Sequence, residues 1–139
     1  MDPAREAALV AAARRAREHA VCSYSGFAVG AALETKEGAV FGGCNVENGT
    51  YGLTVCAERV AIWKALSEGV REFRAVAVVT GAPEPTPPCG ACRQILWEFA
   101  GDIEVVSSTL EGRTKRFHLH ELLPEPFEFD KDMSGNRKP

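Results

Sequence analysis

Helical segments and short valine-rich segments alternate along this chain, and this alternation limits its possible folds more than any other feature. Residues 2–21 are rich in Ala, Arg and Leu, with apolar side chains near helical spacing, which predicts one amphipathic helix capped by Asp2. Residues 27–34 and 39–44 predict two strands, and the short turn between them makes the pair an antiparallel hairpin. Helices that alternate with strands indicate an α/β fold.

The second half of the chain continues this alternation. The link at residues 111–112 is too short to hold a helix, so the strands on either side of it should be antiparallel neighbours. The sequence therefore predicts a three-layer α/β/α sandwich around a mixed five-stranded sheet whose last strand is antiparallel. The expected elements are a helix from Cys56 to near Gly69, a strand over 74–80, a helix that begins at Cys89, and strands over 103–109 and 114–118.

The length of 139 residues corresponds to one domain. We expect a single domain over residues 1–129, followed by a polar, flexible tail over residues 130–139. Hydrophobic residues make up 45% of the chain and charged residues 25%, as in ordinary globular proteins, and no apolar run is long enough to cross a membrane. A formal net charge of −3 argues against a protein that coats nucleic acid.

The first residues mix acids with bases and lack the apolar stretch of a secretory signal, which favours the cytoplasm, where thiols stay reduced. The five cysteines are therefore expected as metal ligands, nucleophiles or core residues rather than as disulfide partners. Cys22 and Cys44 are interpreted as small core or loop thiols, although either is available as the fourth ligand of a structural metal site.

Three other cysteines stand where predicted helices begin. Cys89 and Cys92 form a Cys-x-x-Cys motif, whose backbone lets both sulfurs face one ion, and Cys56 begins the preceding helix. Three thiolates that converge make a tetrahedral zinc site with one open position, which is the pattern of a catalytic zinc. A thioredoxin-like dithiol is the alternative for the motif, but its usual setting near the first strand of a βαβ unit is missing.

Two charged residues accompany the first of these cysteines. Glu58 follows Cys56 by two residues, so its carboxylate can act as general acid and base on a water at the open zinc position without ligating the metal. The alternative is an acid that only complements the helix dipole. Three thiolates give the zinc site a charge of about −1. A guanidinium that donates to the sulfurs would restore the acidity of the zinc; Arg59 is either this donor or a solvated arginine.

The order Cys-x-Glu followed by Pro-Cys-x-x-Cys is the three-cysteine form of the zinc nucleobase-deaminase signature. From about Tyr24 to Phe127, the chain resembles the small homotetrameric cytidine deaminases that act on free nucleosides. The resemblance implies a cytidine-deaminase-like form of the predicted fold. It rests on matches, in the family's order, at residues 24–33, 45–53, 56–59, 88–96 and 122–124.

The resemblance also implies roles for individual residues. It implies one zinc ion per subunit, held by Cys56, Cys89 and Cys92, with Glu58 as the proton shuttle and Arg59 and Gln94 as further donors around the site. It implies substrate contacts by Phe27 at the base, by Asn45 and Glu47 at the ribose hydroxyls, by Ala57, by Tyr51 in the shared pocket with Tyr24, and by Phe127 from a neighbouring subunit. From the residues alone, Phe27 would instead be a strand core residue, and Asn45 and Glu47 would be turn residues.

The implied reaction is hydrolytic deamination of cytidine and 2′-deoxycytidine to uridine and 2′-deoxyuridine, with release of ammonia, in pyrimidine salvage. The implied assembly is a homotetramer that shares its active sites. The short link at 111–112 and the acidic composition favour a free nucleoside over a polynucleotide. The chain differs from the residues that are more common in the family at positions 22–23, at positions 49–50 and at Val55. These differences leave the preferred sugar or base substituent open. The alternatives are deamination of a cytosine-nucleoside antibiotic or modified cytidine, and a non-catalytic, zinc-stabilised binding module.

Overall fold

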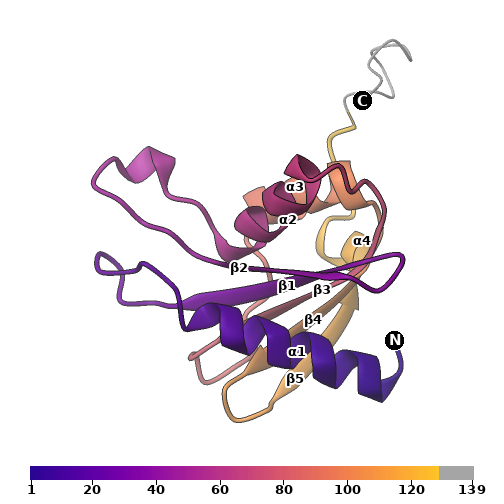
Figure 1. Ribbon diagram of the computed structural model, residues 1–139, viewed down its shortest axis with the longest axis horizontal. Helices are drawn as coiled ribbons and strands as arrows, with labels where there is room; N and C mark the ends of the chain where they lie inside the picture. The colour runs from indigo at the N-terminus through magenta and orange to yellow at the C-terminus, as the bar shows by residue number, and fades with distance from the viewer. Residues whose placement is uncertain (129–139) are drawn as a thin grey trace.

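A mixed sheet of five strands runs through the structure, a computed structural model that describes residues 1–128 (Figure 1). In chain order the strands are β1 (Val29–Thr35), β2 (Val40–Cys44), β3 (Phe73–Thr80), β4 (Glu104–Thr109) and β5 (Thr114–His118), and across the sheet their order is β2-β1-β3-β4-β5. β3 and β4 pair in parallel, whereas β1 with β2, β1 with β3, and β4 with β5 pair antiparallel. The predicted mixed sheet with an antiparallel last strand is confirmed.

Helices cover both faces of the sheet and complete the three predicted layers. α1 (Pro3–Arg17) lies on one face, and α2 (Ala57–Ser67) and α3 (Gly90–Ala100) lie on the other (Figure 1). Because side chains alternate along a strand, β3 sends Val79 into the core under α1 and Val76 into the core under α2 and α3. A strand that is covered on both faces is apolar along most of its length, which explains the run of valines in β3.

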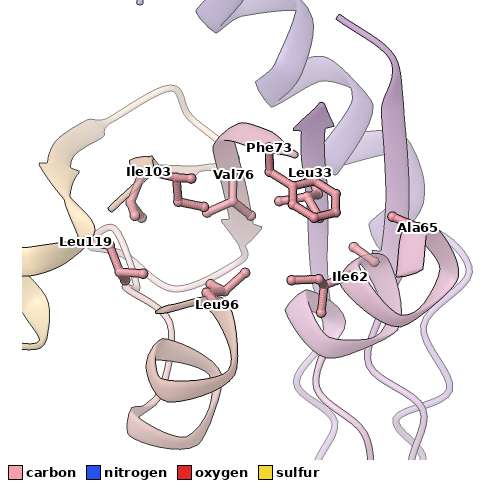
Figure 2. Packing of buried hydrophobic residues seen from close by; sticks show 10 residues of the cluster. Leu33, Ile62, Ala65, Phe73, Val76, Leu96, Ile103 and Leu119 are labelled. Carbon is pink, nitrogen blue, oxygen red and sulfur yellow. The ribbon is translucent and has the colours of Figure 1, made fainter. Parts of the chain in front are cut away.

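The core under α2 and α3 holds these two helices against the same face of the sheet (Figure 2). Leu33 of β1 and Val76 of β3 meet Ile62 of α2 and Leu96 of α3 there, and all four side chains are buried. Burial of a side chain of this size stabilises the fold by about 1.5–3 kcal/mol. The core therefore fixes the positions from which α2 and α3 begin.

The first helix is shorter than predicted. Asp2 caps it as expected, because its Oδ1 accepts a hydrogen bond from the backbone N–H of Arg5 at 2.9 Å. The helix ends at Arg17 because Val21 pairs with the segment that follows β2: Val21 N donates to Asn45 O at 2.9 Å, and Glu47 N donates to Val21 O at 2.8 Å. The predicted helix end at residue 21 was therefore wrong, since a tertiary contact overrides the helical propensity of this segment.

Gly43 lets the start of α2 approach β2 closely. A Cβ at Gly43 would overlap the carbonyl oxygen of Ala57 and would lie 2.6 Å from Ala61 N. A larger residue would push α2 away from the sheet. Because α2 begins directly after Cys56, this glycine also fixes where the Cys56 sulfur stands.

Two short helices were not predicted from the sequence, η1 (Tyr51–Leu53, a 3₁₀ helix) and α4 (Leu119–Leu122). α4 follows β5 directly, and its buried Leu119 donates a backbone hydrogen bond to Ile103 O at 2.9 Å. The other predicted elements have their observed bounds within two residues of the expected ones.

Within residues 1–128, no helix is both long enough and apolar enough to cross a membrane. The single domain over residues 1–129 stays a prediction. The predicted tail over residues 130–139 lies outside the described residues.

Candidate active site

Three cysteine sulfurs meet at the N-terminal ends of α2 and α3. Cys56 and Cys89 are the residues that immediately precede these helices, and Cys92 lies in the first turn of α3. The three Sγ atoms lie within 4.8 Å of one another, and those of Cys56 and Cys89 are 4.0 Å apart. Sulfurs bound tetrahedrally to zinc at about 2.3 Å stand about 3.8 Å apart. The observed spacing therefore fits a zinc ion held by three thiolates.

The burial and charge of this sulfur cluster also suit a cation. A hydrogen bond from the Cys92 thiol, together with one from the Arg59 guanidinium, holds the pKa of the Cys56 thiol well below its usual range. The same bond to Cys56, with burial, raises the pKa of the Cys92 thiol. One sulfur is thus held as a thiolate while its neighbour keeps a proton, and a bound metal would displace that proton.

The sulfur cluster does not include Cys22, Cys44 or any histidine of residues 1–128. Cys22 and Cys44 are free and partly buried, as a small loop or core thiol would be. A structural zinc site needs four protein ligands, whereas a catalytic one leaves a position open. The observed donor set is that of the catalytic kind.

Arg59 contacts the sulfur cluster from the same helix as Glu58. Its Nη2 donates to Cys56 Sγ at 3.2 Å, and its guanidinium carbon lies 5.8 Å from the centroid of the Trp63 ring, one turn further along α2. The charged group is therefore held between a thiolate and an aromatic face. That it withdraws charge from a bound zinc stays a prediction.

Glu58 lies in the first turn of α2, and only 5% of the residue is exposed. Burial, helped by the negative charge of the Cys56 thiolate, raises the pKa of the Glu58 carboxyl to about 7. A carboxyl that titrates near neutrality can both accept and release a proton, which is what a proton shuttle requires. The Glu58 carboxyl lies close to the sulfur cluster, because its charge also helps to raise the pKa of the Cys92 thiol.

The segment before β1 and the segment after β2 form two loops that project from the same end of the sheet (Figure 1), and they hold four of the residues expected at the substrate, namely Phe27, Asn45, Glu47 and Tyr51. Asn45 is buried; its Oδ1 accepts from Val29 N at 2.9 Å and its Nδ2 donates to Phe27 O at 2.9 Å. Glu47 accepts from the backbone N–H groups of Tyr24, at 3.2 Å, and of Ser25, at 3.0 Å. The structure thus brings Phe27, Asn45 and Glu47 together.

A pair of backbone hydrogen bonds connects these loops to the sulfur cluster. Val46 N donates to Val55 O at 2.9 Å, and Val55 N donates to Val46 O at 3.0 Å. Val46 stands between Asn45 and Glu47, and Val55 directly precedes Cys56. The expected ribose contacts and the expected metal site are therefore adjacent in the fold.

The remaining expected residues are mostly exposed aromatics. The ring centroids of Tyr24 and Tyr51 lie 5.7 Å apart at an interplanar angle of 76°. Tyr51 is 74% exposed and Phe127 is 64% exposed, whereas Ala57 is buried at the start of α2.

The side-chain amide of Gln94 holds the backbone of Phe127, with Nε2 donating to Phe127 O at 2.8 Å and Oε1 accepting from Phe127 N at 3.1 Å.

Sequence reasoning missed one participant in this arrangement, Ser25. Its hydroxyl contacts the Glu47 carboxylate and accepts a hydrogen bond from Phe27 N. A signal was present, because a serine two residues before another residue in a turn often accepts that residue's N–H.

A cluster of three thiols beside a buried carboxyl, at the ends of two helices on a mixed sheet, defines a zinc-dependent deaminase of nucleobases. A family model described as the cytidine and deoxycytidylate deaminase zinc-binding region matches residues 3–109. The chain belongs to this family.

Three similar proteins place the chain within the family. A cytidine deaminase of Sporosarcina psychrophila is 47% identical over 120 residues, which cover 86% of this chain and 88% of that protein. The crystal structure of cytidine deaminase from Burkholderia pseudomallei matches with a TM-score of 0.85 and 47% identity, over 91% of this chain and all of that one (100%). A blasticidin-S deaminase of Bacillus cereus is 31% identical over 104 residues, covering 69% of this chain and 74% of that protein.

Proposed function

We propose that this chain, acting as a single domain, catalyses the hydrolytic deamination of cytidine and 2′-deoxycytidine to uridine and 2′-deoxyuridine, with release of ammonia. The observation that carries the proposal is the cluster of three sulfurs, within 4.8 Å of one another, beside the buried carboxyl of Glu58. The relatives named cytidine deaminase support the choice of substrate.

Cys56, Cys89 and Cys92 would hold one zinc ion per subunit. When bound, a zinc ion with three protein ligands acidifies water at its open position. Arg59 donates to Cys56 Sγ and so offsets part of the negative charge that three thiolates place on the site. Gln94 is a candidate for a further donor, although its amide is engaged by the backbone of Phe127.

Glu58 moves the protons of the reaction. Its carboxylate takes one from the attacking water and delivers it to N3 of the base while the oxygen adds at C4. It then takes the remaining proton from the new hydroxyl at C4 and gives it to the amino group, so that the C4 oxygen becomes a carbonyl as the C4–N bond breaks, and cytidine and water become uridine and ammonia. The pKa of about 7 that burial imposes on Glu58 lets the same carboxyl serve in both directions.

The nucleoside would be held by residues of the two projecting loops and of the start of α2. Phe27 would lie against the base, Asn45 and Glu47 would bind the ribose hydroxyls, and Ala57 and Tyr51 would line the pocket. Support comes from the hydrogen bonds that gather Phe27, Asn45 and Glu47 beside the residue that precedes Cys56.

A homotetramer with shared active sites is part of the proposal. Phe127 would reach the active site of a neighbouring subunit, and Tyr24 and Tyr51 would form part of the shared pocket. Support comes from the exposure of these three aromatic side chains, which are 64%, 55% and 74% exposed respectively. Exposed aromatic side chains suit contact with another subunit.

Pyrimidine salvage in the cytoplasm is the physiological setting that we propose. Three free thiols that must remain available to a metal suit a reducing compartment. Membranes and nucleic acids have no place in the proposed role.

Deamination of a cytosine-nucleoside antibiotic or modified cytidine is a second candidate. The observation that favours it is the 31% identity to the protein named blasticidin-S deaminase. A non-catalytic zinc module is less well supported, because the sulfur cluster offers three ligands rather than four within residues 1–128.

A substrate panel tests the proposal. Zinc-loaded protein is assayed for ammonia release with cytidine, 2′-deoxycytidine, blasticidin S and a cytosine oligonucleotide. We expect turnover of the first two and none of the oligonucleotide. Turnover of the antibiotic alone would favour the second candidate, and no turnover by folded, zinc-containing protein would contradict both.

A further inference from the structure

Ser25 connects the two loops that are expected to hold the substrate. Its Oγ lies 2.5 Å from Glu47 Oε2 and 3.0 Å from Phe27 N. A serine hydroxyl has one hydrogen to donate, and a backbone N–H can only donate. The Ser25 hydroxyl therefore donates to the Glu47 carboxylate and accepts from the N–H of Phe27.

We propose that Ser25 is a positioning residue for nucleoside binding, because its hydroxyl holds the Glu47 carboxylate in a fixed relation to Phe27. This inference rests on the proposed function, in which Glu47 binds the ribose and Phe27 lies against the base. A carboxylate on a flexible side chain loses rotational freedom when it binds a ligand, and a bond that fixes it beforehand removes that cost.

The Ser25 hydroxyl is the most direct side-chain link between these two groups. Asn45 Nδ2 also reaches both loops, but it lies 3.3 Å from Glu47 Oε2. Hydrogen bonds in which the acceptor is charged are shorter and stronger than neutral ones, in line with the 2.5 Å distance from Ser25. The Ser25 hydroxyl and then the Ser25 N–H lower the pKa of the Glu47 carboxyl, so this carboxyl is held in its charged form.

The backbone of the turn does not depend on this hydroxyl. Gly26 N donates to Cys22 O at 2.7 Å, and Gly26 has a φ of 69°, which glycine adopts without strain. Asn45 holds the start of β1 through Val29 N and Phe27 O. Ser25 itself is exposed. Removal of its hydroxyl should therefore leave the fold intact and loosen only Glu47 and Phe27.

The test compares Ser25→Ala with Ser25→Thr, which keeps the hydroxyl, and with Ser23→Ala, an exposed serine of the same segment that takes no part in this network. For Ser25→Ala we expect a rise in KM for cytidine of about tenfold, the lower end for a hydrogen bond to a charged group, with kcat within about twofold of the wild type. Ser25→Thr and Ser23→Ala should retain the wild-type KM.

Two further measurements separate positioning from a general loss of structure. With 2′,3′-dideoxycytidine, which offers Glu47 no ribose hydroxyl at these positions, Ser25→Ala should raise KM much less than it does with cytidine, because only the effect through Phe27 remains. In a Glu47→Ala background, which removes the acceptor of the Ser25 hydroxyl, Ser25→Ala should add little, because the two changes disrupt one interaction.

The outcomes distinguish this inference from the proposed function. Wild-type protein that fails to deaminate cytidine contradicts the proposed function. In that case the pKa of Glu47, measured by NMR titration, tests whether the Ser25 hydroxyl holds the Glu47 carboxylate. We expect Ser25→Ala to raise that pKa. An unchanged pKa, or an active wild type whose KM is unaffected by Ser25→Ala, would overturn the inference.

Discussion

At the scale of single residues, Glu58 shows how burial makes a carboxyl chemically useful. Removing water from the carboxylate disfavours its charge, and its pKa is raised to about 7. The same side chain in water would be ionised at neutral pH and would release a proton to the leaving group poorly. The neighbouring sulfurs and Arg59 then determine the charge of the site around it.

Arg59 provides a test of that charge balance. We expect Arg59→Gln to lower zinc affinity or kcat by about 10- to 100-fold, the usual effect of losing a partner of a metal ligand. Arg59→Lys keeps the charge but not the planar guanidinium, so its zinc affinity and kcat should lie between those of Arg59→Gln and those of the wild type. Zinc retention is measured by competition with a chelator and kcat by ammonia release. Arg15→Gln, which changes an exposed arginine of α1, is the control. An Arg59→Gln protein with the same kcat and the same zinc affinity as this control would contradict the prediction.

At the scale of elements, α2 and α3 each begin at the sulfur cluster, and the core holds the starts of both helices in place. α3 does more, because the same helix that carries Cys92 also holds the backbone of Phe127 through Gln94. If Phe127 enters a neighbouring active site, α3 links the zinc of one subunit to the substrate pocket of the next.

Gln94→Leu separates two roles of this residue. If the amide mainly holds Phe127, the substitution raises KM for cytidine and leaves the zinc content unchanged. If it mainly donates to the thiolates, zinc is lost more readily while KM is unaffected. We expect the first result, because both polar atoms of the amide contact the Phe127 backbone. Glu98→Leu, an exposed position one turn further along α3, is the matched control.

Glu34 joins α1 to the sheet and makes stability depend on pH. Its side chain is 7% exposed and accepts hydrogen bonds from Arg5 of α1 and from Arg74 of β3. Burial acts to raise the pKa of this carboxyl, but the two guanidinium groups outweigh it, so the pKa is lowered from 4.5. The stability that Glu34 contributes is therefore fully present above the unfolded value of 4.5 and is lost as pH falls through the lower folded value.

Glu34→Gln should accordingly lower the free energy of unfolding by about 2 kcal/mol at neutral pH, with a deficit that shrinks as the pH falls below 4.5. Glu72→Gln, which removes an exposed partner of Lys36 at 4.0 Å, should change it by less than about 0.5 kcal/mol. Urea unfolding at several pH values measures both. A deficit for Glu34→Gln that stays constant with pH would contradict the assignment.

At the scale of the whole molecule, the proposed tetramer concerns three exposed aromatic side chains. Tyr24, Tyr51 and Phe127 are each more than half exposed. Apolar surface of this kind favours association by the hydrophobic effect. The proposed tetramer would cover it and complete the pockets at the same time.

Light scattering should give a mass of about 60 kDa, four times 15.0 kDa.

Mixing two inactive variants tests whether the active sites are shared between subunits. Glu58→Gln and Phe127→Ala are each expected to be inactive or nearly so. Mixed and reassembled, the two variants should regain part of the activity, because some sites then combine an intact Glu58 with an intact Phe127. A fully active monomer would contradict the shared site.

Local patterns predicted most of the sheet and the metal site, and long-range contacts explain what they missed. The short link at 111–112 predicted the antiparallel last strand, and two helix starts predicted the meeting of Cys56 and Cys89. The end of α1 was missed because Val21 pairs with residues far along the chain. The Ser25–Glu47 contact likewise joins residues 22 positions apart, which no local pattern shows.

The central claim is that three thiolates hold a zinc ion and that Glu58 moves the protons. The most direct measurement is the zinc content and kcat of Glu58→Gln beside the wild type. We predict one zinc per chain in both proteins, with kcat for cytidine lowered by about 10²- to 10⁴-fold in the variant. A Glu58→Gln protein that keeps its zinc and deaminates cytidine at the wild-type rate would contradict the account.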